Sequence, residues 1–508
     1  MRRRRHSSTI RGLTPFSAFG SSDYRPTTVG CCAPAFDRTR STGIIAGHHR
    51  GARVTAGDRP ARAPISDGLF YLLAALCGAL TGIVGAAFHL VVDTLMVWPS
   101  WIVARFGHGI GAILLAAGIA SATLVLAFFL TRRIAPEAAG SGVQEIEGAM
   151  EGLREVRWRR ILPVKFVAGV LSLSSGLVAG REGPTIHMGA SIAAAIAERL
   201  KFQTTELRGL LAAGAAAGLA AAFNAPLAAI LFIIEETRKQ FAYTFRAYTA
   251  VIIASASSAI AMELVGGTAP QLKLGNAEMP LSMLPAFLLL GVLLGGVGWL
   301  FNRTILFMLD WTAKTFRKAP FVPALVVGAA VGALALILPQ AVGGGEMLIP
   351  GLVTGNLPLV TLGILVLLRF VGAMVSYPVG VPGGIFSPML TLATALGLII
   401  GLLVEAMLPT PPLTSAAFAI AAMGGLFAAT VRAPLVGVVL AAELTGGYAL
   451  ILPLIVTCMT SNATAQALGG RPIYELLLER TLRLSGQTAP PSRTGVSAPV
   501  GADDSPRP

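Results

Sequence analysis

The sequence has few charged residues. Only 13% of its 508 residues are charged, whereas 54% are hydrophobic, and the mean hydropathy is +0.72. This composition excludes a soluble protein and predicts a polytopic membrane protein. The apolar segments do not alternate apolar with polar residues, as the strands of a membrane barrel would. We therefore expect an all-α fold, and the 58 glycines fit helices that pack closely in lipid.

Residues typical of metal, disulfide and nucleotide sites are also missing. The four cysteines (Cys31, Cys32, Cys77, Cys458) show neither metal-ligand spacing nor a disulfide framework. The six histidines form no H-E-x-x-H pair, and no G-x-x-x-x-G-K-[ST] loop occurs. These absences argue against an intramembrane hydrolase and against ATP-driven transport. We expect no metal, no cofactor and no enzymatic activity.

The net charge of +14 is unevenly distributed. Residues 1–67 hold 12 Arg and 4 Asp, which gives +8 and leaves +6 for the rest of the chain. The remaining charge is too scattered to indicate nucleic acid as a partner. Residues 1–65 and 485–508 have no apolar run, so we expect disordered tails around a membrane domain at 66–484. The arginine-rich start fits a basic cytoplasmic tail better than an organelle transit peptide.

The first apolar runs predict membrane spans. Gly68–Val97 and Gly109–Leu130 each exceed the roughly 20 apolar residues that cross the hydrocarbon core. Arg132 and Arg133 follow the second run. By the positive-inside rule, this end and the basic N-terminus both lie in the cytoplasm.

A charged pentapeptide stands in apolar surroundings: Gly180, Arg181, Glu182, Gly183 and Pro184. A charge at membrane depth costs about 2.5–3.5 kcal/mol on insertion scales and usually lines a polar pathway. Pro184 suits the first turn of a helix, so we expect Glu182–Ala197 to start inside the membrane with its amides presented to an anion. The alternative is a tight turn at the membrane surface in which Arg181 and Glu182 pair with each other. The five residues do not decide between the two.

The chain shows an internal repeat. Ala220–Leu227 matches Ala428–Leu435 at an offset of 208 residues, and the same offset places Glu235 on Glu443. The spacing G-x-x-x-P at 180–184 returns at 384–388. Two halves, about 66–265 and about 280–484, are therefore expected.

Interrupted apolar helices occur at matching places of these halves, at Glu182–Ala197 and Phe386–Leu403. Such discontinuous helices are typical of a transporter with a binding site at the membrane midplane. A third break comprises Gly140, Ser141, Gly142, Val143 and Gln144. Ser141 is either a hydroxyl donor to a ligand or the N-cap of a helix at Val143–Leu153. Tyr474, near the end of the membrane part, is by default an interfacial anchor.

These breaks, taken in order with Tyr474, resemble the CLC family of chloride channels and proton–chloride antiporters. The similarity runs from about Ser66 to Arg483 and is carried by GSGxx at 140–144, GREGP at 180–184, GGIFSP at 383–388 and GGRPIY at 469–474. The resemblance implies an α-helical fold of two inverted-topology halves and helix N-termini that converge on a midplane anion. It also implies a homodimer in the lipid bilayer, with one anion pathway per subunit.

The resemblance further implies roles for individual residues. Ser141 and Tyr474 would donate hydroxyl groups to chloride, and the backbone amides of Ile385 and Phe386 would complete its shell. Glu182 would gate the pathway and transfer protons on the outer side. Glu236 would transfer protons on the inner side, although the pair Glu235-Glu236 is also compatible with an ordinary helix end that meets water. The predicted filter motifs comprise Gly140, Ser141, Gly142, Val143, Gln144, Gly180, Arg181, Glu182, Gly183, Pro184, Gly384, Ile385, Phe386, Ser387 and Pro388, with a structural role for Arg181.

One position departs from the family pattern. Gln144 stands where the family usually has Pro, which leaves a free N–H and a flexible polar side chain in the first helical turn. Both hydroxyl donors are present, which favours chloride over nitrate or fluoride. We expect a proton–chloride antiporter in a bacterial inner membrane with both termini cytoplasmic. A passive chloride channel of the same fold is the alternative.

Overall fold

The computed structural model describes residues 65–237, 244–266, 279–355 and 357–487. Every regular element in these ranges is a helix, and the strand-like pairing there is confined to two isolated backbone bridges. The prediction of an all-α fold is therefore confirmed. Residues 1–64 and 488–508 of the predicted tails lie outside the described residues.

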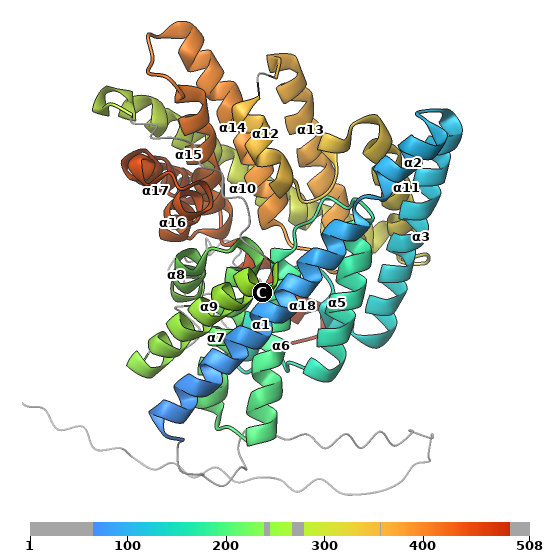
Figure 1. The fold of residues 1–508 in the computed structure, drawn as a ribbon, viewed down its shortest axis with the longest axis vertical. Helices are drawn as coiled ribbons and strands as arrows, with labels where there is room; N and C mark the ends of the chain where they lie inside the picture. Colours follow the sequence, from blue (N-terminus) through green and yellow to red (C-terminus); the bar gives the residue numbers. More distant parts are fainter. Residues whose placement is uncertain (1–64, 238–243, 267–278, 356, 488–508) are drawn as a thin grey trace, which may run out of the picture. The chain divides into compact units, whose positions relative to one another are not determined.

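The helices are coloured in the order of the chain in Figure 1, from blue at the N-terminus to red at the C-terminus. The first half contains α1 (Asp67–Leu95), α2 (Trp98–Phe106), α3 (Ile110–Ile134), α4 (Val143–Met150), α5 (Trp158–Ser174), α6 (Glu182–Leu200), α7 (Thr204–Phe223), α8 (Pro226–Glu236) and α9 (Phe245–Gly266). The second half contains α10 (Leu284–Thr315), α11 (Val322–Ile337), α12 (Ile349–Thr354), α13 (Leu359–Ser376), α14 (Phe386–Met407), α15 (Thr414–Val431), α16 (Pro434–Thr445) and α17 (Ile451–Ala467). The helix α18 (Ile473–Leu484) follows.

Several predicted boundaries shift. The helix of the first span ends at Leu95, and α2 starts at Trp98 with Pro99 in its first turn, so that the candidate span runs from Asp67 to Phe106. The second span runs on to Ile134 because Arg132 and Arg133 continue the helix. The short helix predicted at Val143–Leu153 stops at Met150, where Gly152 adopts a left-handed conformation with φ of 80°.

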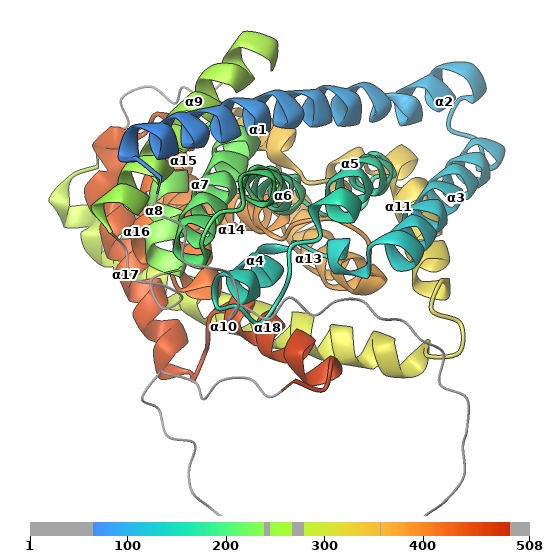
Figure 2. The ribbon, with the colours of Figure 1, turned by 90° about the horizontal axis from the view of Figure 1, so that it is seen from below.

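Nine helical segments of the described ranges are long and apolar enough to cross a membrane, so the chain is a multi-pass membrane protein. α6 is mostly enclosed by other helices. Figure 2 looks along α6, which packs against α1, α5 and α7. Its contact with α7 is very close, because a Cβ atom added at Gly189 would lie 2.1 Å from the carbonyl oxygen of Gly214. Small residues permit this approach between membrane helices.

Equivalent residues of the two halves meet face to face. Gly180 and Gly384, which are 204 positions apart, exchange backbone hydrogen bonds of 2.9 and 2.8 Å in an antiparallel bridge. A residue pairs with its own repeat partner in this reciprocal way when a two-fold axis passes between them. The halves are therefore related by inversion of their topology, as predicted.

A second reciprocal contact supports the same axis. The Glu235 carboxylate, at the end of α8, accepts a hydrogen bond of 3.0 Å from the Val436 amide at the start of α16. The Glu443 carboxylate, at the end of α16, accepts one of 2.8 Å from the Ala228 amide at the start of α8. Each half thus supplies an acidic cap to the helix N-terminus of the other, a contact typically worth about 0.5–2 kcal/mol.

Candidate functional site

Three breaks in the chain come together at one place. The Gly140 amide donates to the Val381 carbonyl at 2.9 Å, and the Gly383 amide donates to the Gly140 carbonyl at 3.2 Å. Gly384 pairs with Gly180 on the other side. The loops before α4, α6 and α14 are therefore joined by backbone hydrogen bonds, and these three helices start around a common point. Converging N-termini favour negative charge there, because each presents unpaired amides and a positive dipole end.

A carboxylate of the protein occupies one of these N-termini. Glu182 Oε1 accepts a hydrogen bond of 2.6 Å from the Phe386 amide, and Oε2 lies 2.8 Å from the Ser387 hydroxyl. The Glu182 side chain is fully buried. It therefore lies across the start of α14, on an amide that the family resemblance assigns to the anion.

The surface-turn alternative for residues 180–184 is wrong. Arg181 forms ion pairs with Asp93 of α1 at 2.9 Å and with Glu346 at 3.3 Å. The carboxylate of Glu182 points instead into the protein, towards α14. Arg181 thus connects the start of α6 to α1 and to the segment that contains Glu346.

The two predicted hydroxyl donors are both buried, and neither has a hydrogen-bond partner within the described protein. Ser141 lies directly against α6, since a Cβ atom added at Gly183 would lie 2.7 Å from Ser141 Cα. The Tyr474 ring packs edge-on against Phe386 at 5.7 Å. Both hydroxyl groups therefore retain a proton that can be donated to an anion.

The two structural alternatives for these residues are wrong. Gly142, with φ of 90°, is the N-cap of α4, and Ser141 precedes it without making a capping bond. Tyr474 is fully buried and cannot be an interfacial anchor.

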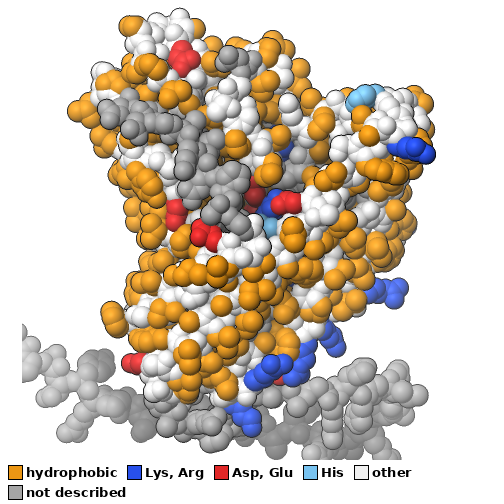
Figure 3. Space-filling model, in the orientation of Figure 1, with side chains coloured by type: hydrophobic (Ala, Val, Ile, Leu, Met, Phe, Trp, Pro, Cys, Tyr) orange, Lys and Arg blue, Asp and Glu red, His pale blue; other side chains and the backbone are white. Residues whose placement is uncertain are grey.

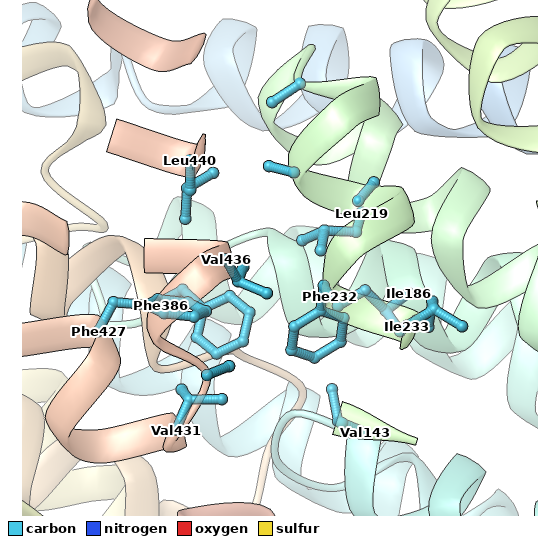
Figure 4. Close-up of a cluster of buried hydrophobic side chains, with 14 of the residues drawn as sticks. Val143, Ile186, Leu219, Phe232, Ile233, Phe386, Phe427, Val431, Val436 and Leu440 are labelled. Atoms are coloured by element: carbon cyan, nitrogen blue, oxygen red, sulfur yellow. The ribbon is translucent and has the colours of Figure 1, made fainter. Parts of the chain in front are cut away.

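Apolar rings surround the start of α14. In Figure 4 the ring of Phe386 lies between Phe427 and Phe232. The ring centroids are 4.8 and 5.6 Å from that of Phe386. Ile385, the residue before it, is also buried. An apolar setting of this kind strengthens the electrostatic attraction between helix N-termini and an anion.

Glu236 is the last residue of α8, one helical turn after Phe232, whose ring contacts Phe386. Its carboxyl group interacts with that of the buried Glu147 on α4. The structure therefore brings Ser141, Glu182, Phe386 and Tyr474 together and places Glu236 beside Glu147 of α4. Arg238, which would accompany the water-facing alternative, is outside the described residues.

The departure at Gln144 does not prevent helix formation, because α4 begins at Val143. The Gln144 side chain is buried, and its carbonyl oxygen lacks a partner. The loop before α4 is fixed instead by Lys165, whose ammonium group donates to the carbonyls of Gly140 at 2.8 Å and Ala138 at 3.0 Å. We missed this lysine in the sequence, although a single charge within the apolar run of α5 was a usable signal.

A second residue missed from the sequence is Glu346. It begins a short 3₁₀ turn at Glu346–Leu348 and contacts both Arg181 and the Ser387 hydroxyl. An acidic residue directly after three glycines in an apolar stretch was again the available signal. Its significance depends on contacts between segments that are far apart in the chain.

Comparison with known proteins assigns the family. Residues 123–466 match the family model described as voltage gated chloride channel. The chain belongs to this family, the CLC proteins. It is 43% identical over 418 residues to the H⁺/Cl⁻ exchange transporter ClcA of Vibrio parahaemolyticus, which covers 81% of this chain and 90% of the relative. It is 42% identical over 437 residues to ClcA of Salmonella paratyphi B, with 85% and 92% covered.

A solved CLC structure agrees with the fold. The crystal structure of a slow cyanobacterial Cl⁻/H⁺ antiporter superposes with a TM-score of 0.78 at 37% sequence identity, covering 82% of this chain and 99% of that one. The predicted CLC fold is therefore confirmed.

Proposed function

We propose that this CLC protein exchanges chloride for protons across the membrane. The observation that carries the proposal is the position of Glu182, whose carboxylate takes the Phe386 amide at the start of α14. The Glu182 carboxylate, which can bind a proton, and a chloride ion cannot both bind the Phe386 amide at the same time. The relatives at 42–43% identity are named H⁺/Cl⁻ exchange transporters, which supports the same function.

The exchange follows from the charge of Glu182. When Glu182 is ionised, the N-terminus of α14 attracts its carboxylate and holds it in place. Protonation removes the negative charge, so the attraction weakens and the amide becomes available to chloride. Chloride would then be bound by the amides of Ile385 and Phe386 and by the hydroxyl groups of Ser141 and Tyr474. These donors are neutral, which permits binding without trapping.

Protons would leave this shared region by a separate inner route. Glu236 would exchange them with the cytoplasm, because it ends α8 beside the buried Glu147 of α4. Separate routes for the two ions on the inner side, together with one shared position at Glu182, would couple the fluxes.

The placement in the cell is part of the proposal. The bacterial relatives support a bacterial inner membrane, and the arginines at the end of α3 support cytoplasmic termini by the positive-inside rule. We also propose a homodimer in the lipid bilayer with one pathway per subunit, which rests on the family resemblance.

A dual-flux measurement tests the function. Purified protein in liposomes should drive protons uphill when a chloride gradient is imposed, with chloride followed by an ion-selective electrode and protons by a pH electrode. Chloride movement without uphill proton movement would contradict exchange and indicate a passive chloride channel. Empty liposomes and liposomes with a proton ionophore provide the controls.

Changing Tyr474 tests the chloride shell. Tyr474→Ala removes both the hydroxyl donor and the ring that packs on Phe386, so chloride affinity measured by calorimetry should fall about tenfold or more. Tyr474→Phe keeps the ring and loses only a hydrogen bond typically worth about 0.5–1.5 kcal/mol, so it should lower affinity only a few-fold. Unchanged affinity in both variants would remove Tyr474 from the shell.

A further inference from the structure

Ser387, in the first turn of α14, stands between two carboxyl groups. Its hydroxyl oxygen lies 2.8 Å from Glu182 Oε2 and is also hydrogen-bonded to Glu346 Oε1. A serine hydroxyl has only one proton to donate. If both carboxyl groups were ionised, Ser387 could donate its proton to only one of them. The other carboxylate oxygen would then lie against a lone pair of the Ser387 hydroxyl oxygen. The arrangement forms two hydrogen bonds only when one carboxyl group carries a proton and donates it to Ser387.

The two carboxyl groups differ in their access to water. Glu182 is fully buried, whereas 24% of the Glu346 side-chain surface is exposed. Glu346 also pairs through its other oxygen with Arg181 at 3.3 Å. Asp93, which also forms an ion pair with Arg181, lies near the C-terminal end of α1, whereas Asp67 is the first residue of this helix. Figure 3 shows charged side chains of both signs grouped beside α1 on this face.

We propose that Glu346 and Ser387 form the outer proton relay of this chain, which carries protons between outside water and Glu182. The proposal rests on the exchange function proposed above. In the inward step, protonated Glu346 donates to Ser387 Oγ while Ser387 donates its own hydroxyl proton to the Glu182 carboxylate. One O–H bond breaks at Glu346, the O–H bond of Ser387 is replaced, and one O–H bond forms at Glu182. The net result is the transfer of one proton, and no other reactant is needed.

The surrounding charges suit Glu346 as a transit position. Arg181 pairs with Oε2 of Glu346 at 3.3 Å, which leaves Oε1 of the same carboxyl group on the Ser387 hydroxyl. The charged and titratable groups that face this cluster are Glu182 and Arg181 from the start of α6, Asp93 and His89 from α1, and Arg369 from α13. The Arg369 guanidinium is bound to the backbone carbonyls of Gln340, Val342 and Gly343, so its hydrogen bonds are made to the loop before Glu346.

The relay predicts the behaviour of Ser387→Ala and Glu346→Gln. Each variant removes one proton-transfer position, which typically contributes about 10²–10⁴-fold, but water can partly replace it, so coupled exchange should slow by about tenfold or more. The loss should be largest at high outside pH, where protons are scarce, and the rate should recover as the outside is acidified. Exchange is measured in liposomes over a series of outside pH values. Ser191→Ala, a buried serine that bonds only within its helix, and Glu155→Gln, an exposed acid, are the matched controls.

Repeating both substitutions in a Glu182→Gln background separates a relay from a merely structural role. Glutamine at position 182 cannot accept a proton from Ser387, so the relay has no function in that background. Ser387→Ala and Glu346→Gln should therefore change chloride flux there by less than about twofold. Equal loss of chloride flux in both backgrounds would overturn the proposal, as would an unchanged rate and pH profile in the wild-type background. Failure of the exchange function itself would appear differently, as absence of uphill proton movement in the unmodified protein.

Discussion

Glu182→Gln is expected to let chloride cross the membrane without protons. Glutamine is neutral and cannot change its protonation state, so it resembles protonated Glu182 permanently. The N-terminus of α14 no longer attracts a negative side chain, and the Phe386 amide remains available to chloride. Proton uptake driven by a chloride gradient should fall by about 10²-fold or more, as expected for loss of a proton-transfer group.

The dependence on outside pH gives a second measurement for Glu182→Gln. Chloride flux in the wild type should rise as the outside is acidified, because protonation of Glu182 releases the amide. In the variant the flux should be nearly independent of outside pH. Glu405→Gln is the matched control, because Glu405 also accepts a backbone amide, that of Ser415 at 2.7 Å, but near the opposite end of α14. Proton uptake that persists in Glu182→Gln would contradict the role of Glu182.

Glu236→Gln should abolish proton movement and leave chloride flux largely intact. Glu236 ends α8 beside Glu147, and glutamine has nearly the same size and shape as glutamate, so the substitution should not alter the anion route. The proton route requires a group that can take both protonation states. Proton uptake should therefore fall by about 10²-fold or more, while Glu182 still gates chloride in response to outside pH.

The contacts of Glu235 and Glu147 indicate which of the two residues to examine if proton uptake survives Glu236→Gln. Glu235 is the neighbour in sequence, but its carboxylate caps the start of α16 by accepting the Val436 amide. Glu147 is the stronger candidate, because it is buried and interacts directly with Glu236. Uptake that survives Glu236→Gln and is lost on adding Glu147→Gln would assign the inner transfer to Glu147. Uptake that survives both changes would contradict an inner route along α4.

The sequence by itself determined the class of fold and most of the residues at the site. Low charge and long apolar runs require membrane helices, because lipid does not hydrate backbone groups. The repeat offset predicted that Gly180 and Gly384 hold equivalent positions, and these residues then proved to be paired. Breaks at Gly140, Gly180 and Gly384 were visible locally, because glycine and proline interrupt apolar helices within a few residues.

Only the tertiary structure decided what those breaks contact. Glu182 and Ser387 are 205 positions apart, and Ser387 and Glu346 are 41 apart, so no local pattern predicts that one hydroxyl joins two carboxyl groups. Ser141 was compatible with an N-cap until Gly142 was found in that position. Tyr474 was compatible with the membrane interface until packing placed its ring on Phe386. Sequence patterns record local propensity and burial, whereas the proton and anion contacts arise from loops that only the packed halves bring together.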